Sequence, residues 1–79
     1  MEFPSLKARR LLAILCREPL AYEVKRQKGS HRRLESRNGY PNLGFSFHDR
    51  ATIPPGLVRK ILVQDVGLSE EEAAELARS

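Results

Sequence analysis

The reactive side chains of this sequence are concentrated in one run, Lys25–Arg33, in which a single histidine, His31, follows a turn formed by Gly29 and Ser30. Histidine titrates near neutral pH, so it can take or give a proton there. Lysine and arginine can hold a phosphate and stabilise the charge that develops as it is displaced, and backbone N–H groups of the turn can contact an anion. The run predicts a phosphate-binding set of five cations: Lys25, Arg26, Lys28, Arg32 and Arg33.

RNA supplies its own nucleophile, the 2′-hydroxyl, so its cleavage needs only a general base, a general acid and cations. We therefore expect no metal and no cofactor. His31 is the candidate base or acid, and His48 is the candidate for the second proton transfer, with water as the fallback. The same run also fits passive binding of RNA or DNA. A histidine beside a β-turn is, moreover, most often an ordinary polar surface residue.

Other chemistries find little support in the sequence. His31, His48 and Cys16 show no metal-ligand spacing, and no Walker loop or dinucleotide fingerprint is present. Cys16 lies in an apolar helical stretch and is predicted to be a small core residue. A single cysteine excludes an internal disulfide, which fits a reducing compartment. No apolar run approaches the roughly 20 residues of a membrane span, so we expect a cytoplasmic protein without a membrane partner.

The charges divide the chain into a basic body and an acidic tail. Residues 1–60 hold 13 of the 14 lysines and arginines and 5 of the 10 acids, a net charge of +8, whereas residues 61–79 carry −4. This asymmetry favours a polyanionic partner. A chain of 79 residues forms one domain, residues 1–79, with one thin core. Its functional site must therefore lie on the surface.

Hydrophobic periodicity predicts an α+β fold. Apolar spacing and a candidate N-cap, Ser5, indicate a helix at 5–16, and Pro54 opens a second helix that ends before Gly67. Ser69 and Glu72 form a capping box for a short C-terminal helix at 69–77. Alternating patterns predict three strands, at 20–27, 31–36 and 44–48. Short connections make these strands an antiparallel sheet with the helices on one face.

Strand alternation then assigns side chains to the two faces of that sheet. The helix-facing set is Tyr22, Val24, Leu34, Phe45 and Phe47. Their neighbours would point to the open face, which would bring both histidines together there. The predicted open face carries Glu23, Lys25, Gln27, His31, Arg33, Glu35, Ser46 and His48. A slip of one residue would exchange the two sets.

These motifs resemble the HicA family of toxins from bacterial and archaeal toxin–antitoxin systems. The family carries a basic-Gln-Lys-Gly-Ser-His run between two strands, which is residues 26–31 here. Its later histidine matches His48, and its Pro-Gly helix start matches Pro55-Gly56. The Arg-x-Ile-Leu helix core corresponds to residues 59–62, and the Gly-hydrophobic-Ser ending to residues 67–69. The resemblance extends from about Ser5 to Leu76.

The resemblance implies an α-β-β-β-α fold like that of double-stranded-RNA-binding domains, and an endoribonuclease that cuts mRNA. It assigns the catalytic role to the turn histidine, here His31, and implies a HicB-type antitoxin that binds the toxin, covers that site and forms a hetero-oligomer with it. The alternative is a non-catalytic double-stranded-RNA-binding module. Such domains rely on lysines at a helix N-terminus, where this chain has Pro54–Val58.

The sequence departs from the family pattern at several positions. Arg32 stands where a second histidine is common, and Arg33 where an apolar residue is common. The third strand reads Phe-Ser-Phe-His, residues 45–48, near a position where the family usually has proline. These changes leave Lys28 and His31 in place.

Overall fold

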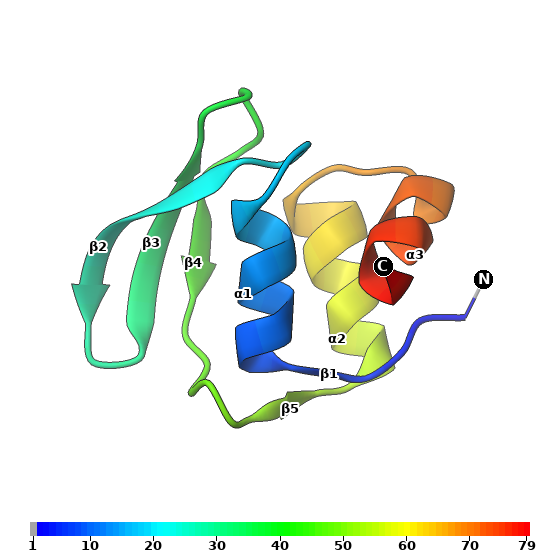
Figure 1. Ribbon diagram of the computed structural model, residues 1–79, viewed down its shortest axis with the longest axis horizontal. Coiled ribbons are helices and arrows are strands. Elements are labelled where there is room, and N and C mark those ends of the chain that lie inside the picture. Colours follow the sequence, from blue (N-terminus) through cyan, green and yellow to red (C-terminus); the bar gives the residue numbers. More distant parts are fainter. Residues whose placement is uncertain (1) are drawn as a thin grey trace.

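The computed structural model describes residues 2–79, which form a sheet beside a group of helices (Figure 1). Met1, the first residue of the predicted domain, lies outside the described residues. The predicted α+β class is confirmed. The elements are β1 (Leu6–Lys7), α1 (Ala8–Cys16), β2 (Tyr22–Lys28), β3 (His31–Ser36), β4 (Leu43–Phe45), β5 (Thr52–Ile53), α2 (Pro55–Arg59), the π-helix η1 (Lys60–Asp65) and α3 (Glu70–Arg78).

The main sheet is antiparallel, with β3 between β2 and β4. Leu34 in β3 lies opposite Val24 on one side and Leu43 on the other. Leu34 and Leu43 are buried, whereas Val24, which the alternation assigned to the helix-facing set, is 41% exposed. Its pairing with Leu34 turns it toward the helix side, but β2 is an edge strand with a neighbour on one side only, and Val24 stays partly uncovered there.

A second, two-stranded sheet was not predicted. β1 pairs with β5, Leu6 opposite Ile53, and this pairing holds residues that the sequence assigned to the first helix. That helix therefore begins at Ala8, and Ser5 is not its N-cap. The helix has no side-chain cap; instead, the N–H groups of Ala8 and Arg9 donate to the carbonyl oxygens of Ala51 and Asp49, at 2.8 and 3.2 Å. These bonds satisfy donors that a helix start leaves free.

The second helical segment is continuous but changes its winding. α2 runs into η1, where the N–H of Val66 donates to the carbonyl of Ile61, five residues earlier, at 2.9 Å. Gly67 then ends the segment with φ +94°, a conformation that favours glycine, and Leu68 packs into the core, as predicted. The capping box that precedes α3 is also confirmed: the Glu72 N–H donates to Ser69 Oγ at 3.1 Å.

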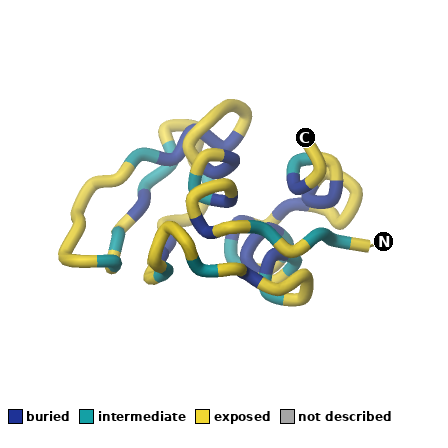
Figure 2. The backbone as a smooth tube through the Cα atoms, turned by 60° about the horizontal axis from the view of Figure 1, so that its bottom comes forward, coloured by how far each residue is buried: buried dark blue, intermediate teal, exposed yellow. Residues whose placement is uncertain are grey.

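The core lies between the sheet and the helices, where the buried segments of Figure 2 gather. The sheet contributes Tyr22, Leu34 and Phe45, and α1 contributes its buried stripe, residues 8, 11, 14 and 15. Cys16 follows that stripe at the helix end and is exposed, so its predicted core position is wrong. Partial desolvation raises the pKa of its thiol, and the charge of Arg32 offsets part of the rise. Within residues 2–79, no helix is long and apolar enough to span a bilayer.

Tyr22 links the sheet to the loop after β3, and its ionisation should couple stability to pH. Its hydroxyl donates to the Pro41 carbonyl at 2.6 Å. Burial, assisted by Tyr40, raises its pKa from 10.0 to about 12. A raised pKa favours the neutral phenol in the folded state, so this stabilisation is complete below pH 10.0 and is lost as pH rises through about 12.

We expect Tyr22→Phe to lower the free energy of unfolding at neutral pH by about 1 kcal/mol, the typical worth of one hydrogen bond. Denaturant unfolding of both proteins near neutral pH and near pH 12 would measure the difference, which should shrink at the higher pH. A difference that stays constant between the two conditions would contradict the assignment.

Candidate functional site

The β2–β3 hairpin positions His31 at the first residue of β3, directly opposite Lys28. Gly29 adopts φ +62° in the turn between them, which favours glycine. His31 is exposed, and its Nδ1 lies 3.0 Å from Ser46 Oγ, just beyond β4. This hydrogen bond orients the imidazole and occupies Nδ1, so Nε2 is the ring nitrogen left for a ligand.

A β-bulge at Lys25 changes which cations share the face of His31. The register shifts between Val24 and Arg26, so Arg26 lies opposite Arg33, while Gln27 lies opposite Arg32. Directly opposed residues point to the same face of a sheet. Arg26 and Lys28 therefore lie on the open face with His31 and Arg33. The predicted alternation, which put Gln27 there, fails because the bulge inserts one residue.

Gly44 forms a bare patch on this face. It lies in β4 opposite Arg33, and it carries no side chain to fill the space between the strand and its charged neighbours. A hollow of about 560 Å³ opens over it. The hollow is lined by Arg26, Gln27, Lys28, His31, Arg32, Arg33, Gly44 and Ser46.

The five predicted cations fall into two groups. Lys25 pairs with Glu23 at 3.0 Å, which raises the pKa of Lys25 and lowers that of Glu23. Arg32 pairs with Asp49, also at 3.0 Å. Across residues 2–79, no carboxylate forms an ion pair with the other three cations, Arg26, Lys28 and Arg33. Their charge is therefore available to an external anion.

Arg32 points away from the open face. It lies opposite Phe45, on the helix side of β3, and its side chain is only 12% exposed. Its Nη1 is buried without a hydrogen-bond partner, and Nη2 donates to Asp49. The guanidinium thus connects the sheet to the loop after β4, although Arg32 is also one of the residues that line the hollow.

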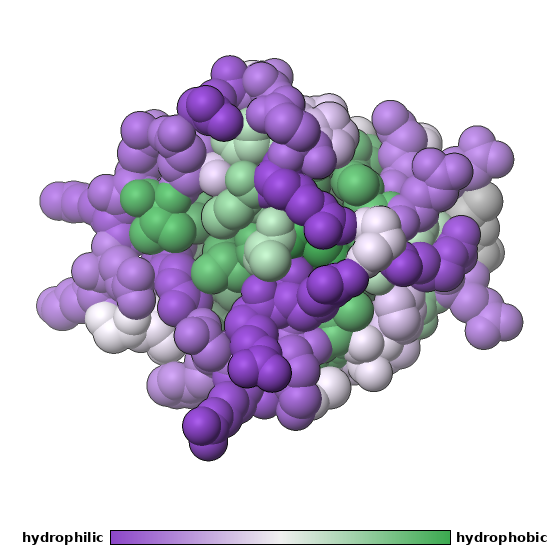
Figure 3. All heavy atoms as spheres, in the orientation of Figure 1, coloured by the Kyte–Doolittle hydropathy of each residue, from purple (hydrophilic) through white to green (hydrophobic). Residues whose placement is uncertain are grey.

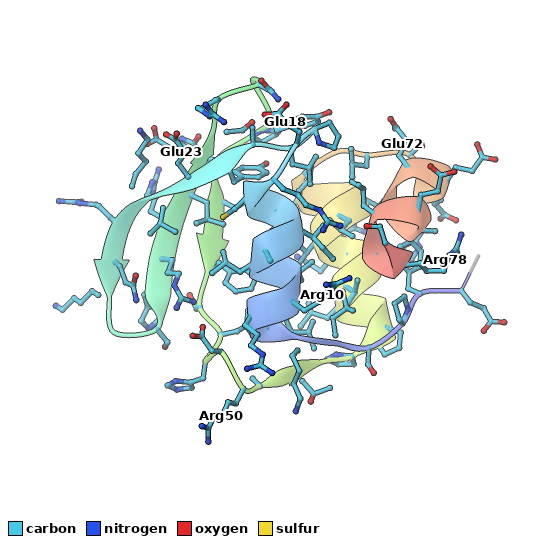
Figure 4. All side chains as sticks on the ribbon, in the orientation of Figure 1. Arg10, Glu18, Glu23, Arg50, Glu72 and Arg78 are labelled. Carbon is cyan, nitrogen blue, oxygen red and sulfur yellow. The ribbon has the colours of Figure 1, made fainter. Side chains whose placement is uncertain are left out.

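His48 does not line this hollow. β4 ends at Phe45 rather than at the predicted residue 48, so strand alternation no longer governs where His48 points. It lines a second hollow of about 460 Å³, together with Gly29, Ser30, Arg32, Phe47, Asp49 and Arg50. Arg50 projects outward from the loop between β4 and β5 (Figure 4).

Comparison with known families identifies the family of this chain. The sequence model of the HicA toxin of bacterial toxin–antitoxin systems matches residues 8–68, from the first residue of α1 to Leu68, just beyond the second helical segment. The chain belongs to the HicA toxin family. No curated protein and no solved structure matches it.

The family match contains every residue that lines the two hollows of this HicA protein, whereas α3 lies beyond it. Hydrophilic side chains largely cover the β2–β3 side of the molecule (Figure 3).

Among the described residues, no three His, Cys, Asp or Glu side chains cluster closely enough to hold a metal ion.

Sequence reasoning found part of this site and missed the rest. It placed His31, Arg33 and Ser46 on one face, and the register confirms this for His31 and Arg33. It overlooked Gly44 as the floor of the hollow and Asp49 as the partner of Arg32. Strand alternation assigns faces only to residues with side chains, so it gave no signal for Gly44, and Asp49 lies beyond the predicted strands.

The two paired cations lead to a stability prediction. Asp49→Ala leaves the largely buried Arg32 guanidinium without its carboxylate, so we expect the free energy of unfolding to fall by about 1 kcal/mol. Lys25→Ala is the matched control, because it breaks an exposed pair and should barely move the unfolding midpoint. Denaturant unfolding of both variants measures this. Equal effects would contradict the structural role of Arg32.

Proposed function

We propose that this HicA protein is the toxin of a type II toxin–antitoxin system and an endoribonuclease that cleaves mRNA in the cytoplasm, with His31 as its catalytic residue. The observation that carries the proposal is an exposed imidazole whose Nδ1 is hydrogen-bonded to Ser46, among three cations that have no carboxylate partner within residues 2–79. Family membership supports the toxin role.

The cleavage step follows from the chemistry of RNA. The 2′-oxygen attacks the adjacent phosphorus, the bond from phosphorus to the 5′-oxygen breaks, and a cyclic 2′,3′-phosphate forms. Nε2 of His31 takes the proton from the 2′-hydroxyl, or gives one to the departing 5′-oxygen. Because the nucleophile belongs to the substrate, the proposed mechanism is metal-independent and uses no cofactor.

The cations bind and stabilise the reacting phosphate. Lys28 lies directly opposite His31 in the hairpin, and Arg33 is two residues farther along β3 on the same face. Both would contact the scissile phosphate and stabilise its added negative charge. Arg26, opposite Arg33, would contact the neighbouring backbone. In this proposal Lys25 and Arg32 contribute less to RNA binding, because each forms an ion pair with an acidic side chain of the protein.

One histidine cannot take and give a proton in the same step, so a second group must act. His48 lines the neighbouring hollow and would have to act across the Gly29–Ser30 turn. Water is the other candidate, since the hollow of His31 is open to solvent at the surface.

A HicB-type antitoxin would neutralise the toxin by covering the hollow over Gly44. Membership in a toxin–antitoxin family implies a partner, and the three cations around the hollow favour an acidic surface on that partner. The proposed inactive form is a hetero-oligomer of toxin and antitoxin.

We expect His31→Ala to reduce RNA cleavage by at least a hundredfold, since general acid–base catalysis contributes roughly that factor or more. The purified variants would be compared on one RNA under single-turnover conditions, and their induced expression should arrest growth for wild type alone. His48→Ala is the matched variant. A loss comparable to that of His31→Ala assigns the second proton transfer to His48, and a loss below about tenfold assigns it to water.

Wild-type cleavage rates in a folded His31→Ala protein would refute the catalytic assignment. RNA binding by wild type without any cleavage would instead favour the double-stranded-RNA-binding module.

The roles proposed for the cations predict that loss of Lys28 and loss of Lys25 change the salt dependence of RNA affinity by different amounts. Each phosphate contact to a single strand contributes about 0.7 to the slope of log affinity against log salt concentration. We expect Lys28→Ala to reduce that slope by about this amount and Lys25→Ala to reduce it much less. Fluorescence anisotropy over a salt series measures both. Equal slopes for the two variants would contradict the role given to Lys28.

A further inference from the structure

The face beside His31 offers more space than a phosphate requires. A Cβ built on Gly44 would meet no atom within 4 Å, so the strand itself does not demand glycine there. The missing side chain opens the floor of a hollow of about 560 Å³. Sites for small organic molecules usually enclose roughly 300–1,000 Å³. A group as large as a nucleobase therefore fits beside the imidazole.

The residues around this floor suit a flat, polarisable ligand. Arg26 and Arg33 are cross-strand partners and have no ion-pair partner among residues 2–79. Like charges placed directly opposite each other destabilise a sheet. A bound ligand that stacks on the two guanidinium groups, or lies between them, would reduce this repulsion. Guanidinium planes stack on unpaired bases of RNA as well as binding phosphates.

We propose that the hollow over Gly44 is a subsite for one unstacked nucleobase of single-stranded RNA, next to the phosphate at His31. The proposal rests on the nuclease function and specifies its substrate class as unpaired RNA. Bases inside an A-form duplex are stacked and paired, and proteins read such a duplex through its phosphates and 2′-hydroxyls. A duplex would therefore leave the floor empty.

Gly44→Val fills the floor and tests the subsite. Valine suits a strand, and the space around the Cβ is open, so the melting temperature should not fall. The probes are a labelled single-stranded RNA and the matching duplex, with fluorine in place of each 2′-hydroxyl so that neither is cut. We expect the affinity of Gly44→Val for the single strand to fall about tenfold, within the range for loss of one stacked base. Affinity for the duplex should be unchanged.

Two further variants complete the design. Gly44→Ala, with a smaller side chain, should give an intermediate loss and replaces the valine variant if that protein fails to fold. Gly56→Ala is the control, because Gly56 is exposed and open to a Cβ but lies outside the hollow. It should bind both probes like wild type.

The outcomes separate the subsite from the nuclease. Unchanged single-strand affinity in folded Gly44→Val and Gly44→Ala would overturn the subsite, even if wild type cleaves RNA. An equal loss of affinity for the single strand and for the duplex would also overturn it, because the hollow would then bind phosphates and not a base. A selective loss in a protein that cuts no RNA would support the subsite and remove the nuclease function.

Discussion

Burial of Leu34 in the middle of β3 fixes the register on which the candidate site depends. This side chain is fully buried and lies opposite Val24 and Leu43. Burying a leucine contributes roughly 1.5–3 kcal/mol, and a slip of one residue would move it to the open face. The same slip would turn His31 and Arg33 toward the helices. The apolar core therefore holds the imidazole and its neighbouring arginine at the surface.

The bulge at Lys25 adds a second constraint to the same hairpin. Without it, regular alternation would place Gln27 beside His31; with it, Arg26 and Lys28 join that face. The extra residue also interrupts the edge strand β2, which limits pairing with other chains. The open surface consequently carries three cations, Arg26, Lys28 and Arg33, that form no ion pair within residues 2–79. Such a surface attracts a polyanion or an acidic partner before any close contact forms.

The loop after β4 connects this surface to the helical layer. The backbone carbonyl of Asp49 accepts a hydrogen bond from Arg9 in α1, and its carboxylate pairs with Arg32 in β3. One residue thereby ties the first helix to the central strand, just beyond the serine that contacts His31. A domain of this size has a small core, so such links contribute to holding the face that carries His31 in one geometry.

The sequence by itself determined the fold class, the hairpin turn at Gly29, the capping box at Ser69 and the cluster of cations around His31. These depend on periodicity and on local chemistry, both of which the chain carries in neighbouring residues. Only the tertiary structure decided that Ser46 contacts His31 and that Asp49 pairs with Arg32. It also decided that Gly44 lines the hollow and that Ser5 does not cap a helix. Each of these results from contacts between segments far apart in the chain, or from a bulge that no local pattern marks. Side-chain periodicity reports which face a residue prefers, but strand pairing and packing decide which residues meet there.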